Sequence, residues 1–134
     1  ALGSQYWASH PHKPGYRARY GILLDMVAAP GLCFYREYFS NYYAPHIIDK
    51  VWECAARLGY GSTFVNSMGG AITDDHLYMN RGGVPSIDII QMNSNSETGF
   101  FDQWHTIDDN MKHIDTYMLE AVGQTVMTVI YEEK

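Results

Sequence analysis

The sequence predicts an α/β fold in which a partial mixed or parallel sheet is covered by helices. Two short, nearly continuous apolar runs have the length of strands, and two longer segments place apolar residues on one helical face. These elements alternate along the chain, which is typical of a layered α/β structure. Hydrophobic residues make up 46% of the 134 residues, which is ample material for one core.

Two strands are predicted, over residues 21–27 (GILLDMV) and 84–90 (VPSIDII). An apolar run of this length is typical of a strand that is buried on both faces. Each run is interrupted by a single carboxylate, Asp25 in the first and Asp88 in the second. The pair Phe64 and Val65 is a weaker candidate for a third strand, so the visible sheet is small.

Two helices are predicted, over residues 42–58 and from Asp115 to near the C-terminus. Gly59 follows the first at the usual terminating position, and Asp115 is the N-cap of the second. The apolar faces consist of Ile47, Ile48, Val51, Trp52, Ala55 and Leu58 in the first helix and of Leu119, Val122, Val126, Val129 and Ile130 in the second. Residues 3–9 look like the end of a further helix.

Charge and cysteine content exclude several functions. Nine Lys and Arg against fifteen Asp and Glu give a formal net charge of −6, and the only basic cluster is Lys13, Arg17 and Arg19, so no nucleic-acid partner is expected. The longest stretch without charges, residues 58–73, is rich in Gly and Ser, so no membrane span is expected. Cys33 and Cys54 are predicted to be two small buried residues or at most one disulfide.

Carboxylates in and beside the apolar strands are the candidate functional groups. An ionised Asp25 in a buried strand costs several kcal/mol unless a cation or several donors meet it, although a strand-end Asp that caps the next loop remains an equal alternative. Asp74, Asp75 and His76 are expected in an extended loop, where only one of the two acids faces a site. Asp88 repeats the argument for Asp25 and could pair with His76 or an arginine.

A zinc site is suggested by these carboxylates together with His105, which follows Trp104 in a predicted loop. Oxygen and imidazole donors from separate elements are the ligands of zinc sites that keep open positions. The remaining histidines are expected to lie on turns or helix surfaces, and these are His10, His12, His46 and His113.

Four ordered segments, LLDMVAAP, GGAITDDH, RGGVPSIDII and WHTIDDN, resemble the zinc-dependent exopeptidases of the M28 aminopeptidase type. They are most similar to the related animal-type glutaminyl-peptide cyclotransferases, including those of Bacteroidetes. The resemblance implies that residues 1–134 are the C-terminal portion of a single M28-like catalytic domain whose N-terminal half is absent. We therefore expect the chain alone to be inactive and to bind zinc weakly or not at all. We also expect it to aggregate, or to pair with itself or with that half. The resemblance also implies that the protein is exported, to the periplasm or as a lipoprotein.

The resemblance also assigns roles. His105 corresponds to a zinc ligand. Asp25 corresponds to a ligand of a second zinc in the aminopeptidases, and to a group that contacts substrate or moves protons in the one-zinc cyclases. Asp74 corresponds to a member of the same proton network. The supporting groups of this network would be Asp75, His76 and Asp88. The residues that would line the substrate pocket are Trp104, Phe100 and Phe101.

Three functions follow from this resemblance. The favoured one is part of a zinc-dependent glutaminyl-peptide cyclotransferase, which acts on a peptide with a free N-terminal glutamine. The alternative is a two-zinc aminopeptidase, and a second alternative is a binding module that has lost the chemistry. Ala28 and Tyr78 depart from the family pattern, in which Gly follows LDMV and Pro stands near the DDH motif, and both departures concern substrate preference more than fold.

Overall fold

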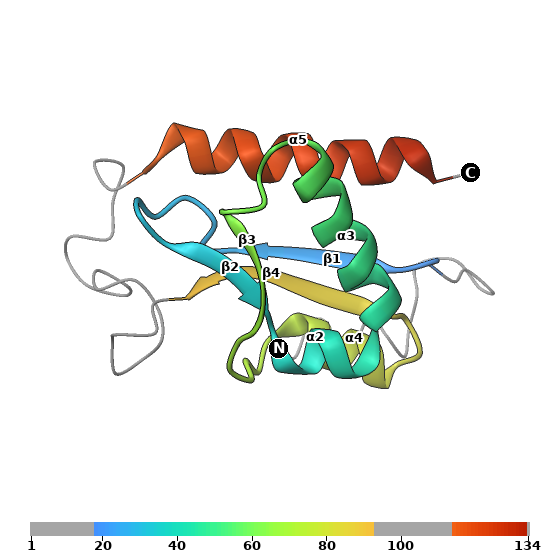
Figure 1. Ribbon diagram of the computed structural model, residues 1–134. Helices are drawn as coiled ribbons and strands as arrows, with labels where there is room; N and C mark the ends of the chain where they lie inside the picture. The colour runs from blue at the N-terminus through green and yellow to red at the C-terminus, as the bar shows by residue number, and fades with distance from the viewer. Residues whose placement is uncertain (1–17, 93–113, 134) are drawn as a thin grey trace.

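The computed structural model describes residues 18–92 and 114–133, and all structural statements concern these residues. They form four strands and four helices (Figure 1). In chain order these are β1 (Gly21–Asp25), β2 (Cys33–Arg36), α2 (Tyr38–Tyr43), α3 (Pro45–Arg57), β3 (Phe64–Met68), α4 (Asp75–Arg81), β4 (Ser86–Met92) and α5 (Thr116–Glu132).

The sheet is mixed and has the strand order β1-β4-β2-β3. β4 pairs in parallel with β1 and antiparallel with β2, while β2 and β3 are parallel. Helices cover both faces, with α5 above the sheet and the short helices α2 and α4 below it in Figure 1. This arrangement confirms the predicted fold class, a mixed sheet covered by helices.

The strands differ from the prediction in two respects. β2 was not predicted, because its sequence, CFYR, is too short and too mixed to show a period. β1 is not buried on both faces, since Leu24 is 47% exposed. Among the described residues β1 is an edge strand of the sheet, whereas β4 is paired on both sides and buried along its whole length.

The helix predicted over residues 42–58 is two helices, α2 and α3. Ala44 ends α2, and Pro45 begins α3, because proline lacks the N–H that a continuous helix would use. Gly59 follows α3 with φ of 91°, which confirms the predicted glycine terminator. Five of the six residues predicted for the apolar face of α3 are buried, and Leu58, the C-cap, is only partly buried. Cys54 is buried as well, although it was not part of the predicted face.

The N-cap of α5 is predicted correctly, since the Asp115 side chain accepts a hydrogen bond from the N–H of Tyr117. The predicted apolar face is partly wrong, because Leu119 and Ile130 are 44% and 51% exposed. Each lies one position from a buried residue, about 100° around the helix. The buried stripe is instead formed by Met118, Ala121, Val122, Thr125 and Val129.

Cys33 and Cys54 are both free thiols, and only Cys54 is fully buried. Cys54 packs under α5, where its sulfur lies 3.7 Å from the carbonyl oxygen of Thr125. Within residues 18–92 and 114–133, no helix has both the length and the apolar character needed to cross a bilayer.

Candidate active site

Three carboxylates from three different elements meet on the α2 and α4 face of the sheet. Asp25 is the last residue of β1, Asp88 lies within β4, and Asp74 is the N-cap of α4. One carboxylate oxygen from each lies within 4.8 Å of the other two. The structure therefore brings together three of the acids that the sequence singled out.

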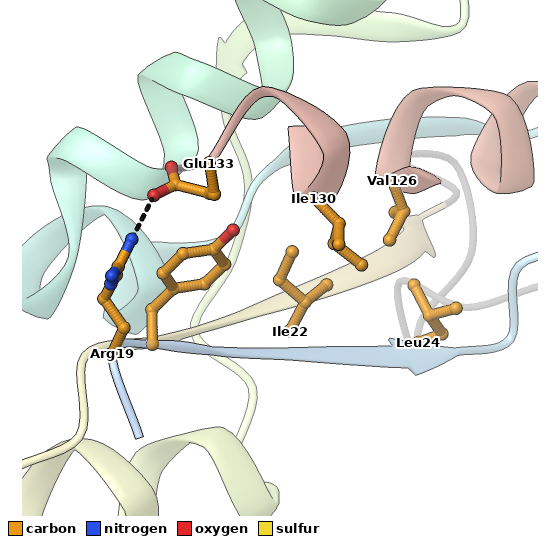
Figure 2. Close-up of a pocket in the computed structure, with 7 residues that line it drawn as sticks. Arg19, Ile22, Leu24, Val126, Ile130 and Glu133 are labelled. Atoms are coloured by element: carbon orange, nitrogen blue, oxygen red, sulfur yellow. Dashed lines mark hydrogen bonds and ion pairs between the residues drawn. The ribbon is translucent and has the colours of Figure 1, made fainter. Parts of the chain in front are cut away.

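The parallel pairing of β1 and β4 explains why Asp25 and Asp88 share a face. Asp88 lies opposite Leu23 in the register, and Leu23 is two residues before Asp25. Side chains two residues apart on a strand point to the same face, and paired residues do so as well. Ile22 and Leu24, which alternate with these residues, face α5 on the other side (Figure 2).

The extended loop predicted for residues 74–76 is wrong. Asp74 accepts a hydrogen bond from the N–H of Asp75, where α4 begins, so Asp75 lies in the first helical turn. His76 is inside the helix and nearly fully buried. An N-cap Asp followed by a second acid is a normal helix start, but the preceding glycines favoured a loop interpretation.

Burial and the neighbouring carboxylates raise the pKa values of two of these groups, Asp25 and Asp88. Burial raises the pKa of Asp88 to about 8, and the nearby charges of Asp25 and Asp74 add to the effect. Burial also raises the pKa of Asp25 to about 6, together with its hydrogen bond to Asp74. Neither oxygen of Asp88 has a hydrogen-bond partner, although the residue is completely inaccessible to solvent. At neutral pH the cluster therefore both holds and releases protons.

Glu37, which sequence reasoning missed, extends the cluster into the protein. It is completely buried, and its Oε1 lies 2.8 Å from Nε2 of His76. On the other side of the ring, Nδ1 lies 3.8 Å from Oδ2 of Asp88. Burial alone would raise the pKa of Glu37, but hydrogen bonds from His76, Ser40 and two backbone N–H groups hold it below its ordinary value. No sequence signal identifies this residue, because an acid before a helix is commonplace.

The loop after Asp25 is held in place by Gln91 of β4. The Gln91 side chain accepts from the N–H of Ala29 at 2.7 Å and donates to the carbonyl oxygens of Ala29 and Leu32, both at 3.0 Å. Met26, directly after Asp25, has a positive φ of 47°, which is uncommon for a residue with a side chain. The Gln91 side chain thus anchors the loop at Ala29 and Leu32, and the backbone N–H of Gln91 donates to the carbonyl oxygen of Met26 at 3.4 Å.

Four of the predicted site residues belong to the part of the chain that the structure does not describe. These four are Trp104, Phe100, Phe101 and His105. Three of the other histidines also lie outside the described residues, namely His10, His12 and His113. His46 is exposed on α3, as expected for a surface histidine.

The groove in Figure 2 is separate from the carboxylate cluster. It has a volume of about 460 Å³ and lies between β1 and α5, on the opposite face of the sheet. Ile22, Leu24, Val126 and Ile130 line it, and an ion pair between Arg19 and Glu133 lies at one end. Apart from this ion pair and the phenol of Tyr20, the side chains that line the groove are apolar.

The donor set of the cluster fits a divalent cation. Three carboxylates converge, and the unpaired, buried oxygens of Asp88 are groups that a nearby positive charge would stabilise. Carboxylate oxygens are accepted ligands of zinc, although a catalytic zinc site usually includes imidazole as well. Among the described residues only His76 could contribute one near the cluster, and its Nε2 already contacts Glu37.

Comparisons with known proteins agree with the family resemblance seen in the sequence. Residues 1–130 match the family model for peptidase family M28. The chain is 26% identical over 143 residues to glutaminyl-peptide cyclotransferase of Bos taurus, with 93% of this chain and 37% of that protein covered.

Two solved structures illustrate the structural similarity. The glutaminyl cyclase of Porphyromonas gingivalis is 55% identical with a TM-score of 0.94, over 98% of this chain and 48% of that one. A leucine aminopeptidase precursor from Bacteroides thetaiotaomicron is 54% identical with a TM-score of 0.92, over 99% of this chain and 44% of that one. The chain thus spans less than half the length of these relatives, and it belongs to peptidase family M28.

Proposed function

We propose that this chain forms part of the active site of a zinc-dependent glutaminyl-peptide cyclotransferase, which converts an N-terminal glutamine to pyroglutamate. The observation that carries the proposal is the cluster of Asp25, Asp74 and Asp88, in which two carboxyl groups have pKa values near neutrality. Acid–base groups are most effective when their pKa lies near the working pH.

The reaction requires a proton to move from one nitrogen atom of the substrate to the other. The α-amine of the substrate attacks the γ-carboxamide carbon, a C–N bond forms within the substrate, and the original C–N bond breaks to release ammonia. The attacking amine loses a proton and the leaving amine gains one. We assign this transfer to Asp25, which lies at the end of its strand and is hydrogen-bonded to Asp74.

Zinc is part of the proposal, with His105 as the ligand that this chain supplies. When bound, zinc would polarise the carboxamide carbonyl. Two structural relatives are named as zinc-dependent exopeptidases, from Parabacteroides distasonis and, as a putative one, Bacteroides vulgatus. Trp104, Phe100 and Phe101 are proposed as walls of the substrate pocket.

An aminopeptidase is the second candidate, because a similar structure is named a leucine aminopeptidase precursor. In that enzyme class Asp25 would bind a second zinc ion instead of a proton. By the family resemblance, Trp104 before His105 and the DDH motif favour the cyclase. The bovine relative and several bacterial structures named as glutaminyl cyclases also favour the cyclase.

The test uses the gene product that contains this chain, assayed with peptides that begin with Gln or Leu, together with a zinc determination. We expect ammonia release from Gln peptides and one zinc ion per chain. Asp25→Asn should lower cyclisation by at least about 100-fold, whereas Glu53→Gln, which removes an exposed carboxylate from α3, should leave it unchanged.

Cleavage of Leu peptides with two zinc ions would instead establish the aminopeptidase, and no turnover of either peptide would favour a binding module. Parallel assays of the 134-residue chain show whether it carries all the groups required. Export to the periplasm, or as a lipoprotein, is likewise proposed from the family resemblance and is tested by cell fractionation.

A further inference from the structure

Glu37 makes more hydrogen bonds than its place at the start of α2 requires. It is the N-cap of this helix, and its two carboxylate oxygens accept from the N–H groups of Phe39 and Ser40, both at 2.9 Å. These two contacts complete the cap, for which the shorter side chain of aspartate is a preferred residue. Glu37 is nevertheless completely buried and has three further contacts, which lead to other elements.

Two of the further contacts lie on either side of Asp74. Oε2 of Glu37 accepts from the N–H of Ile72 at 2.9 Å, and Oε1 lies 2.8 Å from Nε2 of His76. Ile72 lies two residues before Asp74, and His76 lies two residues after it, inside α4. One carboxylate therefore holds both the backbone that leads to Asp74 and the helix that follows it.

The third contact leads to Asp88 in β4. The hydroxyl of Ser40 donates to Oε1 of Glu37 at 2.7 Å and accepts from the N–H of Asp88 at 2.8 Å. β2 pairs with β4 further along the strand, at Gln91 and Met92, and at Asp88 the Ser40 hydroxyl is the partner of the backbone instead. Glu37 is thus connected by hydrogen bonds to the backbone around two of the three acids in the cluster.

We propose that Glu37 is a positioning residue that sets the separation of Asp74 and Asp88. One carboxylate oxygen from each of these acids lies within 4.8 Å of the other and of an oxygen of Asp25. The proposed proton transfer depends on this spacing, because small displacements of reacting groups slow a reaction strongly. No bond to Glu37 is made or broken in the reaction. This inference rests on the proposed function.

Glu37→Asp separates the capping role from the positioning role. Aspartate can still accept from the N–H groups at the start of α2. Its side chain is shorter by a methylene group, so the carboxylate is withdrawn from Ile72 and His76. The matched control is Glu53→Asp, which makes the same change at an exposed position on α3. Val129→Ala removes buried methyl groups beneath α5, on the opposite face of the sheet, and controls for a general loss of stability.

The first measurement compares kcat with KM in the gene product. Glu37→Asp should lower kcat about 10- to 100-fold, because the acids that take part in proton transfer are displaced. Its KM should stay close to that of the wild type, since the proposed walls of the substrate pocket are unchanged. Both controls should keep the wild-type kcat. A wild-type kcat in Glu37→Asp, or an equal loss of kcat in Val129→Ala, would overturn the proposal.

Hydrogen exchange followed by mass spectrometry tests the positioning role without turnover. In Glu37→Asp, the peptides that cover residues 70–76 and 86–92 should exchange about tenfold faster, while peptides from α5 keep the wild-type rate. No change in the first two peptides, or an equal increase in α5, would refute the inference. If these exchange rates change as expected but the wild type converts neither Gln nor Leu peptides, the proposed function fails and the positioning role is retained.

Discussion

Replacement of Asp88 by asparagine should remove a large part of the pH dependence of stability. The pKa of Asp88 is raised from 3.8 to about 8 in the folded protein, because of burial and the neighbouring carboxylates. Between these two values the folded state keeps a proton that the unfolded state has lost. The free energy of unfolding therefore falls as the pH rises through this window, by up to about 1.4 kcal/mol per pH unit.

The asparagine side chain of the Asp88→Asn variant would imitate the protonated carboxyl group. Its amide can donate to Nδ1 of His76, and it has no charge to be buried when the pH rises. At pH 5, where Asp88 is protonated, the variant and the wild type should have similar stability. At pH 8 the variant should be more stable, by about 2 to 4 kcal/mol from the three intervening pH units.

Urea denaturation of the gene product at pH 5 and pH 8, after removal of metal with a chelator, measures this difference. Glu53→Gln serves as the control, because it removes an exposed carboxylate from α3, and its pH profile should parallel that of the wild type. If the stability difference between Asp88→Asn and wild type is the same at both pH values, the buried carboxyl group is not the proton-binding group inferred here.

Three further changes test the local structure. Gln91→Leu leaves the N–H and carbonyl of Ala29 without their partner, so it should lower the free energy of unfolding by about 1 to 3 kcal/mol per unpaired group; an unchanged melting temperature would contradict the role of this amide. Ser40→Ala removes the acceptor for the N–H of Asp88 and should cost about 1 to 3 kcal/mol in urea denaturation, and a neutral result would show that this hydrogen bond is not formed. Asp115→Ala removes the N-cap of α5 and should cost about 1 kcal/mol, whereas a gain in stability would argue against the cap.

The elements with strong local signals could be predicted from the sequence. The apolar run of β4, the terminator Gly59 and the N-cap Asp115 each depend on neighbouring residues alone, and all three are observed. β2 could not be predicted, because its four residues owe their conformation to pairing with β3 and β4. The break at Pro45 was missed because the apolar pattern on either side is helical.

The candidate site was predictable where a residue conflicts with its surroundings. Asp25 and Asp88 stand out as acids within apolar runs, and the structure brings them together. Glu37 does not stand out, since its sequence neighbours are polar and aromatic residues. Its burial results from long-range contacts with Ile72 and His76, which no local pattern encodes.

The register between β1 and β4 has a consequence for folding. A shift of β4 by a single residue would turn Asp88 toward α5, among aliphatic side chains such as Val122 and Val129. Misaligned pairing would thus bury a carboxylate in hydrocarbon, at a cost of several kcal/mol. Asp88, which belongs to the proposed catalytic cluster, therefore also raises the free energy of the misaligned sheet. Replacement of Asp88 by a hydrophobic residue would make this misaligned pairing more favourable.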